Sequence, residues 1–314
     1  MSNKLKRLVS SKVPHTYDGT SLIDYLCLRY KYQSREGWLS LIDVGDLRIN
    51  SLIASAEQIL KFNDLLEYDH TPNIEPEVDR NYELLFEDDY LAVINKPGDL
   101  PMHPSGKFFN NTLWALLKPG FGDIHFINRL DRETSGLVLL AKDSKTAAKL
   151  AGQFERREVE KEYLVIVEGQ FERQIQARGF LKKDTGSQVR KKLSFEAVEN
   201  YQDHGKDGVF SEFWPVSQTS QFSLVKVKIH TGKMHQIRAT LFSLGYPIVG
   251  DKIYGVDDNF FEKFIAKTLS ADDKKRMVLK RQALHAEKLS FKHPESGELV
   301  NYVAPVPQDM QELI

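Results

Sequence analysis

The spacing of apolar residues predicts two short helices near the start of the chain. In residues 20–30, apolar positions recur at helical spacing behind a Thr-Ser start, and residues 34–45 begin with a serine cap and end at a glycine. Residues 46–55 contain two brief apolar stretches around an Asn-Ser pair, and residues 64–68 contain another. These stretches predict short strands after the helices, with a turn at the Asn-Ser pair.

Farther along, strand patterns dominate. Residues 82–98 predict two strands around an Asp-Asp turn, and residues 161–169 and 222–230 alternate apolar and polar positions. In the last of these stretches, the valines and the isoleucine share one face and the lysines share the other. Helices are expected over 111–120 and 144–158. This pattern indicates an antiparallel sheet with one solvated face.

A change in composition separates the two patterns. Residues 64–79 contain six acidic residues and two prolines, which is typical of a linker. With 314 residues and 41% hydrophobic content, the chain is long enough for two domains. We therefore expect a small domain over 1–70, an acidic linker over 71–81 and a larger domain over 82–314.

Composition also limits the class of protein. Cys27 is the only cysteine, the first residues lack an apolar leader, and no window approaches the roughly 18 apolar residues that span a bilayer. A cytoplasmic protein that does not enter a membrane is expected. The net charge is only −1, but positive charge clusters in 178–192. That cluster predicts either a phosphate-binding surface or a solvated lysine-rich hairpin.

One acidic residue stands in an unusual place. In "HFINRLDRETSGLVLLAKD", Asp131 lies between Arg129 and Arg132, directly before a small-residue segment and an apolar strand. Three interpretations are open: a surface salt bridge, an acid that caps the local backbone, and a catalytic acid held against a cation. Thr134, Ser135 and Gly136 are expected to form the turn that fixes Asp131, with the glycine allowing close backbone approach.

This segment resembles the signature of the RluA/RluD-type pseudouridine synthases. Four other blocks resemble the same family and stand in the same order, so that the likeness covers about residues 82–306: "INKPGDLPMHPSG", "KEYLVIVEG", "TGKMHQIRATLFSLGYPIVGDKIYG" and "ALHAEKLSFKHPESGE". Two positions depart from the family pattern. Asn128 stands where the family usually has histidine, and Lys233 stands where it usually has arginine.

The resemblance implies an α+β fold with a mixed, mostly antiparallel sheet and a central cleft. It also implies a reaction in which uracil leaves its ribose, turns and rejoins through carbon-5, which needs no cofactor or metal. Breaking the glycosidic bond builds positive character at the anomeric carbon, which a carboxylate can stabilise, trap or deprotonate. The resemblance assigns this catalytic role to Asp131 and the partner cation to Arg238. Arg238 is expected to lie off the apolar stripe of its helix and to reach the cleft.

The family blocks imply further site residues. Tyr163 matches a family tyrosine that can stack on an extruded uracil and assist removal of the carbon-5 proton. Arg129 is expected to fill the gap left by the flipped base, because its planar guanidinium stacks and binds phosphate, although it could instead pair with a neighbouring acid. The remaining predicted RNA contacts are Lys233, His235, Gln236, Lys182, Lys183 and Arg190.

The sequence therefore favours a monomeric RNA pseudouridine synthase that acts on ribosomal or transfer RNA. Residues 1–70 also resemble the small RNA-binding domain of the ribosomal protein S-four type, although they could instead form a small packing or interaction domain. Two alternatives remain: a protein that binds or folds RNA without turnover, and a hydrolase of nucleosides or glycosides, which would usually need a second acid or a metal. Residues 256–282 fit either a target-specific insertion or a surface helix.

Overall fold

The computed structural model describes residues 8–31, 33–69, 75–199, 207–257 and 259–314. The chain divides into two compact units. One comprises Met1–Pro76 with Ser105–Asn110, and the other comprises Glu77–Pro104 with Asn111–Ile314. The first of these boundaries falls inside the stretch predicted as a linker. The membership of 105–110 in the first unit was not predicted, because nothing in the local pattern marks that excursion.

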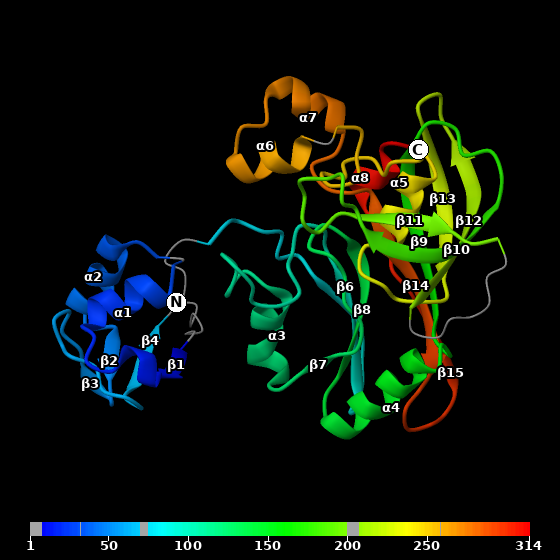
Figure 1. Cartoon of the computed structure of the whole chain (residues 1–314). Coiled ribbons are helices and arrows are strands. Elements are labelled where there is room, and N and C mark those ends of the chain that lie inside the picture. The colour runs from blue at the N-terminus through cyan, green and yellow to red at the C-terminus, as the bar shows by residue number, and fades with distance from the viewer. Residues whose placement is uncertain (1–7, 32, 70–74, 200–206, 258) are drawn as a thin grey trace. The chain divides into compact units, whose positions relative to one another are not determined.

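In the described residues of the first unit, short helices accompany a four-stranded antiparallel sheet (Figure 1). After the short 3-10 helix η1 (His15–Tyr17) come α1 (Leu22–Arg29) and α2 (Arg35–Asp43). The strands have the spatial order β1-β4-β2-β3, with bounds β1 (Leu8–Lys12), β2 (Leu47–Ile49), β3 (Leu52–Ile53) and β4 (Leu65–Asp69). Within this unit, the carboxylate of Glu75 accepts hydrogen bonds from the amides of Phe109 and Asn110 at 2.7 and 2.8 Å.

The predicted helix starts and the predicted hairpin in this unit are confirmed. Ser21 and Ser34 accept hydrogen bonds from backbone amides three residues later, and so they cap α1 and α2. Asn50 and Ser51 both have positive φ, 51° and 69°, which suits a two-residue hairpin turn. Strand β1 was not predicted. Its residues alternate only between exposed and partly exposed positions, so its sequence has no strong apolar pattern.

A larger sheet of eleven strands organises the second unit (Figure 1). Its main path runs β11-β10-β12-β13-β9-β14-β8-β6-β5, and β15 and β7 pair with β14 and β8 respectively. The bounds are β5 (Glu83–Glu87), β6 (Leu91–Lys96), β7 (His125–Phe126), β8 (Ser135–Ala141), β9 (Glu160–Glu168), β10 (Ile175–Lys183), β11 (Leu193–Ala197), β12 (Gly208–Gln218), β13 (Phe222–Ile229), β14 (Leu284–Lys292) and β15 (Leu299–Val303). Within the described ranges, only β8 and β14 pair in parallel. The α+β fold with a mixed, mostly antiparallel sheet is confirmed.

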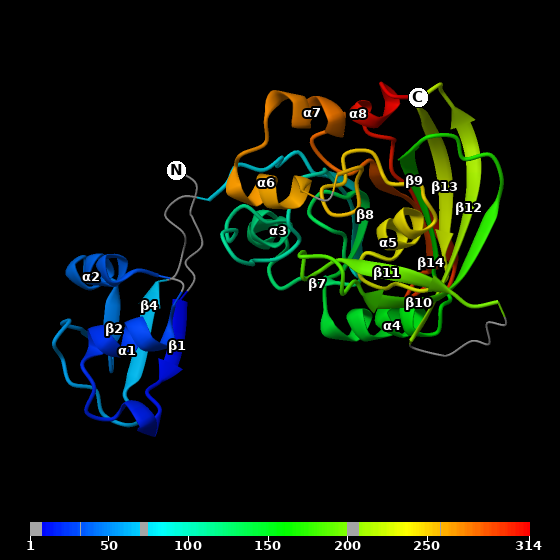
Figure 2. The same cartoon turned by 45° about the horizontal axis from the view of Figure 1, so that its top comes forward.

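Short helices accompany this sheet: α3 (Leu113–Phe121), α4 (Ser144–Glu155), α5 (Gln236–Ser243), α6 (Phe260–Ala266), α7 (Ala271–Met277) and α8 (Gln308–Gln311). Thr112 caps α3 by accepting a hydrogen bond from the amide of Ala115. Helix α4 lies against β7 and β8 (Figure 1), and α5 lies against β10 and β11 (Figure 2). For residues 256–282, the sequence left two interpretations open. The described part of this segment contains the short helices α6 and α7.

The alternation along β13 behaves as predicted. Val225 and Val227 are fully buried in a cluster with residues of β9 and α5. On the other face, Lys226 pairs with Glu162 and Lys228 pairs with Glu160, at 2.7 and 2.8 Å. One face of this part of the sheet therefore builds the core, and the other is a row of solvated ion pairs.

The turn that carries Asp131 is placed differently from the prediction. The amide of Thr134 donates to the carbonyl of Asp131 at 3.1 Å, so that the turn spans 131–134, and Ser135 and Gly136 already belong to β8. The predicted close approach at Gly136 is confirmed. This glycine has φ 110°, and a Cβ there would lie 2.2 Å from the carbonyl oxygen of Ala286 on β14.

Gly136→Ala should therefore destabilise the protein by about 2–4 kcal/mol, because alanine meets both a disfavoured φ and a backbone clash. Gly120→Ala is the matched control, since a Cβ there meets nothing within 4 Å. We expect that control to change stability by less than about 1 kcal/mol. Urea unfolding of both variants provides the measurement, and equal stabilities would show that β8 and β14 can separate freely at this point.

Candidate active site

A cavity of about 300 Å³ opens where the turn 131–134 approaches β9, β13 and α5. Four separate segments contribute its walls: the turn before β8, strand β9, the segment from the end of β13 into α5, and strand β14. The lining residues are Arg129, Leu130, Asp131, Thr134, Tyr163, Ile229, Gly232, Lys233, Met234, His235, Gln236, Ile237, Arg238 and Leu284. Apolar side chains form much of the wall, and charged groups enter from the turn and from α5.

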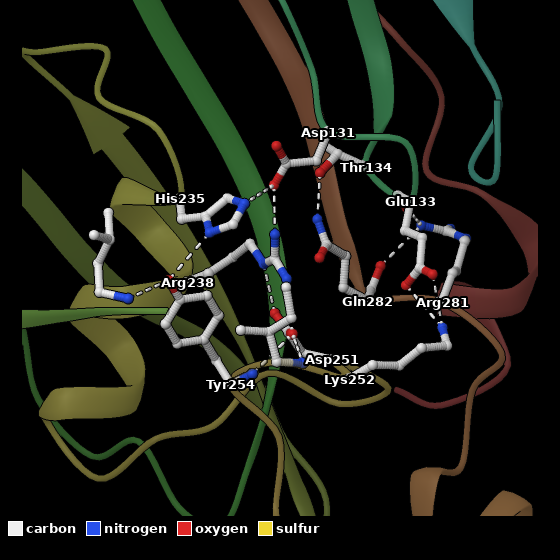
Figure 3. A network of polar contacts seen from close by, with 12 residues as sticks. Asp131, Glu133, Thr134, His235, Arg238, Asp251, Lys252, Tyr254, Arg281 and Gln282 are labelled. Atoms are coloured by element: carbon white, nitrogen blue, oxygen red, sulfur yellow. Dashed lines mark hydrogen bonds and ion pairs between the residues drawn. The ribbon is translucent and has the colours of Figure 1, made fainter. Parts of the chain in front are cut away.

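Asp131 and Arg238 form an ion pair in this wall. The Nη1 of Arg238 donates to Oδ2 of Asp131 at 2.6 Å (Figure 3). The side chain of Asp131 is 34% exposed, whereas that of Arg238 is only 7% exposed. Among the described residues, no group is hydrogen-bonded to Oδ1 of Asp131. Arg238 thus holds one oxygen of a carboxylate group that lines the cavity.

A second carboxylate, Asp251, holds the opposite side of the Arg238 guanidinium. Nε and Nη2 of Arg238 donate to Asp251 at 2.6 and 2.9 Å, and Asp251 is fully buried (Figure 3). Burial alone would raise the pKa of Asp251, but the charge and hydrogen bonds of Arg238 and the amides of Tyr254 and Ile253 lower it below its ordinary value. Burial likewise opposes the charge on Arg238, yet the two carboxylates raise its pKa. Arg238 is therefore fixed as a cation.

The expectation that Arg238 lies off the buried stripe of its helix was wrong. Residues 236–241 of α5 are all buried, so the helix has no solvated face near its start. Arg238 reaches the cavity from inside the protein, because Asp251 compensates its buried charge. The periodicity of the sequence could not reveal this compensation.

Tyr163 lines the cavity from β9, with Val227 of β13 and Ala286 of β14 as its neighbours in the sheet. Burial, and then the negative charge of Asp131, raise the pKa of Tyr163 to about 12. At neutral pH, its hydroxyl is therefore protonated. The side chain offers the cavity an aromatic wall and an O–H group.

A third set of contacts surrounds His235, directly before α5. Its Nδ1 lies 3.1 Å from the hydroxyl of Tyr254, and its Nε2 lies 3.8 Å from Oδ2 of Asp131. The ring of Tyr254 also packs against the guanidinium of Arg238, 5.1 Å from its Cζ. Burial, followed by the charge of Arg238, lowers the pKa of His235, so that this imidazole is neutral at neutral pH.

The acid beside Asp131 has cations of its own. Glu133 accepts two hydrogen bonds from Lys252 at 2.8 Å (Figure 3). It accepts another from Arg132 at 2.8 Å. The buried amine of Lys96 donates to the carbonyls of Leu100 and Arg132 and so supports the turn from behind. Burial, then the charge of Arg281, lowers the pKa of Lys96 to about 7. Because Glu133 is paired with Lys252 and Arg132, the guanidinium of Arg238 binds only Asp131 and Asp251 among the described carboxylates.

The predicted RNA-contacting residues fall into two groups. Arg129, Lys233, His235 and Gln236 all line the cavity. Arg129 is exposed, and within the described ranges it forms no ion pair with Asp131 or Glu133. The side-chain amide of Gln236 is used internally by Thr231, Lys233, Phe210 and Ser211. Its geometry is that of a residue that shapes the segment before α5.

The hairpin of β10 and β11 carries the second group. Lys182, Lys183 and Arg190 are exposed and lie outside the cavity lining. Lys182 pairs with Glu196 across the hairpin, and Arg190 borders a separate groove beside α6. Their contact with RNA stays a prediction.

Asp251 and Tyr254 were missed as site residues. Both belong to a block that was recognised, "GYPIVGDKIYG", but no role was given to them. The available signal was an acid that ends an apolar run, "YPIVGD", where a buried carboxylate needs a cation. Asn128, one of the two family departures, bonds the backbone of Leu137 and Leu139 on β8, at 3.0 and 2.8 Å. It therefore anchors the start of the Asp131 segment.

The described residues offer neither a cluster of metal ligands nor a membrane-spanning helix. Across the part of the chain that the structure describes, His, Cys, Asp and Glu side chains form no group of three or more that could hold a metal ion. Of the helices in the same part, none has the length and apolar character needed to cross a membrane.

Comparisons with known proteins identify the family of the chain. Residues 90–243 match the family described as RNA pseudouridylate synthase. Ribosomal large subunit pseudouridine synthase D of Zymomonas mobilis is 32% identical over 241 residues, which cover 74% of this chain and 71% of that protein. The mitochondrial tRNA pseudouridine(32) synthase of Saccharomyces cerevisiae is 34% identical over 239 residues, 76% of this chain. This chain spans 51% of the length of the yeast protein.

Among solved structures, Human RNA Pseudouridylate Synthase Domain Containing 1 superposes with a TM-score of 0.56 at 23% identity. The superposition covers 74% of this chain and 86% of the human one, and it shows a common fold. The chain belongs to the RluA/RluD-type family of RNA pseudouridine synthases, a class of isomerases. The resemblance inferred from the sequence blocks is confirmed.

Proposed function

We propose that this protein isomerises uridine to pseudouridine in ribosomal or transfer RNA, with Asp131 as the catalytic carboxylate. One observation carries the proposal: Asp131 stands in the wall of a cavity of about 300 Å³, with one oxygen held by a buried arginine and no hydrogen bond to the other among the described residues. The names of the bacterial and yeast relatives support RNA as the substrate class.

The chemistry follows from the charge of that pair. Cleavage of the glycosidic bond leaves positive character at the anomeric carbon, and an anion beside it lowers the barrier. Because Arg238 engages Oδ2, Oδ1 of Asp131 is the oxygen that faces the sugar. From there it can stabilise the charge, bond to the anomeric carbon or accept a sugar proton. All three acts require the same ionised carboxylate.

Tyr163 and the apolar wall are proposed to hold the detached base. Its ring offers a stacking surface for the pyrimidine, and the protonated hydroxyl can donate a hydrogen bond to it. Since the negative charge of Asp131 opposes formation of the phenolate, Tyr163 acts as a wall and hydrogen-bond donor in the free protein. Retention of uracil in this pocket separates isomerisation from hydrolysis.

Arg129 is proposed to replace the flipped uridine in the base stack. It lies at the cavity, is exposed and has no ion pair within the described residues, so its guanidinium is available to RNA. Arg129→Ala should lower kcat/KM about 10- to 100-fold on a structured RNA, because base extrusion costs a few kcal/mol.

On an unstructured oligonucleotide with the same target sequence, the loss should be less than about threefold, because the base needs little unstacking. Rates of both RNAs with Arg129→Ala and Arg129→Lys provide the measurement. Arg173→Ala, outside the cavity lining, is the matched control. Equal losses on both RNAs would remove the stacking role.

The wider RNA surface is proposed to include Lys233 at the cavity and Lys182, Lys183 and Arg190 on the hairpin, because phosphate contacts dominate affinity for RNA. We also propose that residues 1–70 contribute to RNA binding and that the protein acts as a cytoplasmic monomer. Mapping pseudouridines across total cellular RNA with and without this protein would identify the target. A site that disappears with the protein and returns with it is the expected result.

A further inference from the structure

Two hydrogen-bond contacts connect the backbone of β11 to the ring of His235, which in turn faces the carboxylate of Asp131. The amide of Leu193 donates to the hydroxyl of Tyr254 at 2.9 Å, and that hydroxyl lies 3.1 Å from Nδ1 of His235. Nε2 of His235 faces Oδ2 of Asp131 at 3.8 Å. Figure 3 shows His235 between the Tyr254 ring and Asp131. Segments far apart in sequence thus converge on one carboxylate oxygen.

The direction of each hydrogen bond fixes where the protons lie. The Tyr254 hydroxyl accepts from the Leu193 amide, and its own O–H must find an acceptor because the side chain is fully buried. Among the described residues, Nδ1 of His235 is the acceptor within reach. The imidazole therefore accepts at Nδ1 and carries its proton on Nε2, the nitrogen that faces Asp131.

The surroundings keep His235 in that form. Its side chain is only 8% exposed, and its backbone adopts φ 56°, a left-handed conformation that non-glycine residues rarely adopt. Burial, and then the charge of the nearby Arg238 guanidinium, lower the pKa of His235 and so disfavour a second proton on the ring. The imidazole is thus a neutral donor aimed at the same oxygen that Arg238 holds.

We propose that His235 is a positioning residue that presents its Nε2–H to Oδ2 of Asp131, and that Tyr254 selects this tautomer. The inference rests on the proposed function, in which Oδ1 of Asp131 meets the sugar. Arg238 and His235 then approach Oδ2 together and fix the plane of the carboxylate. Nε2 and Oδ2 are 3.8 Å apart in the free protein, and the proposal requires this distance to shorten to a hydrogen bond in the complex with substrate.

The first test reads the tautomer directly and needs no RNA. Nitrogen NMR of protein labelled with ¹⁵N-histidine distinguishes a protonated ring nitrogen from an unprotonated one, and the signals absent from His235→Gln identify His235. We expect Nε2 to be protonated and Nδ1 to be unprotonated in the native protein. In Tyr254→Phe, this preference should be lost. A proton on Nδ1 in the native protein would overturn the proposal.

The second test compares two replacements of nearly the same shape. His235→Gln keeps an N–H near the position of Nε2, whereas His235→Met does not. In single-turnover reactions with saturating protein, His235→Met should be about tenfold slower and His235→Gln within about threefold of the native rate. RNA affinity should stay within about twofold for both. For the Tyr254→Phe variant of the first test, Tyr302→Phe on β15 is the control for loss of a tyrosine hydroxyl.

Besides a proton on Nδ1 in the native protein, three outcomes would overturn the inference: equal rates for the glutamine and methionine variants, weaker RNA binding with an unchanged rate, or an unchanged tautomer in Tyr254→Phe. If Tyr254→Phe fails to fold, the tautomer of His235 in the native protein and the rates of His235→Gln and His235→Met still test the proposal. Absence of isomerisation by the native protein would instead refute the proposed function, and the NMR result would stand apart from it.

Discussion

Asp131→Asn should lower kcat by at least about 10⁴-fold while RNA affinity stays within about threefold of the native value. The amide has nearly the same shape as the carboxylate, but it carries no negative charge for the anomeric carbon and cannot act as nucleophile or base. Arg238 remains anchored by Asp251, so the cavity should keep its form. Rapid-quench assays of pseudouridine formation and equilibrium RNA binding separate these two effects.

Asp123→Asn is the matched control, because that carboxylate is 98% exposed and lies outside the cavity lining. It should retain the native rate and affinity. An Asp131→Asn variant that turns over at more than about one hundredth of the native rate would remove Asp131 from the mechanism. A variant that no longer binds RNA would show that the charge serves binding.

Asp251→Asn should destabilise the protein by about 3 kcal/mol and lower kcat about 100-fold. It removes the charge that compensates the buried Arg238, and loss of one partner from a buried ion pair typically costs about 3–5 kcal/mol. Without that anchor, the guanidinium no longer holds a fixed angle to Asp131. Guanidinium chloride unfolding and the single-turnover rate provide the two readouts.

The stability of the native protein at low pH should also depend on the pair of Asp251 and Arg238. The pKa of Asp251 is lowered in the folded protein, so its contribution to stability is complete above the ordinary aspartate pKa, near 4, and is lost as pH falls through the lower folded value. The native protein should therefore lose more stability below about pH 4 than Asp251→Asn does.

The control for the predicted loss of stability is Glu158→Gln. Glu158 forms a two-bond pair with Arg156, at 2.8 and 3.0 Å, but both side chains of this pair are exposed. Its loss should change stability little and leave kcat unchanged. If the two variants lost equal stability, the special cost of the buried pair at Asp251 would be disproved.

The local parts of the fold could be predicted because single residues encode them. Ser21 and Ser34 each precede an amphipathic stretch, and serine in that position caps a helix. The alternation along β13 follows from the pleat of a strand. Strand β1 was not predicted, because the side chains of its Leu-Val-Ser-Ser-Lys sequence are exposed or only partly buried. The turn at 131–134 was misplaced by a few residues, because Ser135 and Gly136 are required for pairing with β14.

The site was predictable only in part, because it depends on long-range contacts. Asp131 and Arg238 are 107 positions apart, and no periodicity links them. The resemblance to known family blocks supplied that pair. The blocks gave no hint that Arg238 is buried, or that Asp251 and Tyr254 lie behind it, because those facts depend on how α5 packs against β10 and β11. Exposed lysines of the hairpin carry no comparable geometric signal.

The most direct test of the account is release of the carbon-5 hydrogen. Cellular RNA labelled with tritium at carbon-5 of uridine, prepared without this protein, would be incubated with the purified chain. The account predicts tritium release to water in a one-to-one ratio with pseudouridine formed, and none with Asp131→Asn. Release of free uracil, or no tritium release from any cellular RNA, would contradict it.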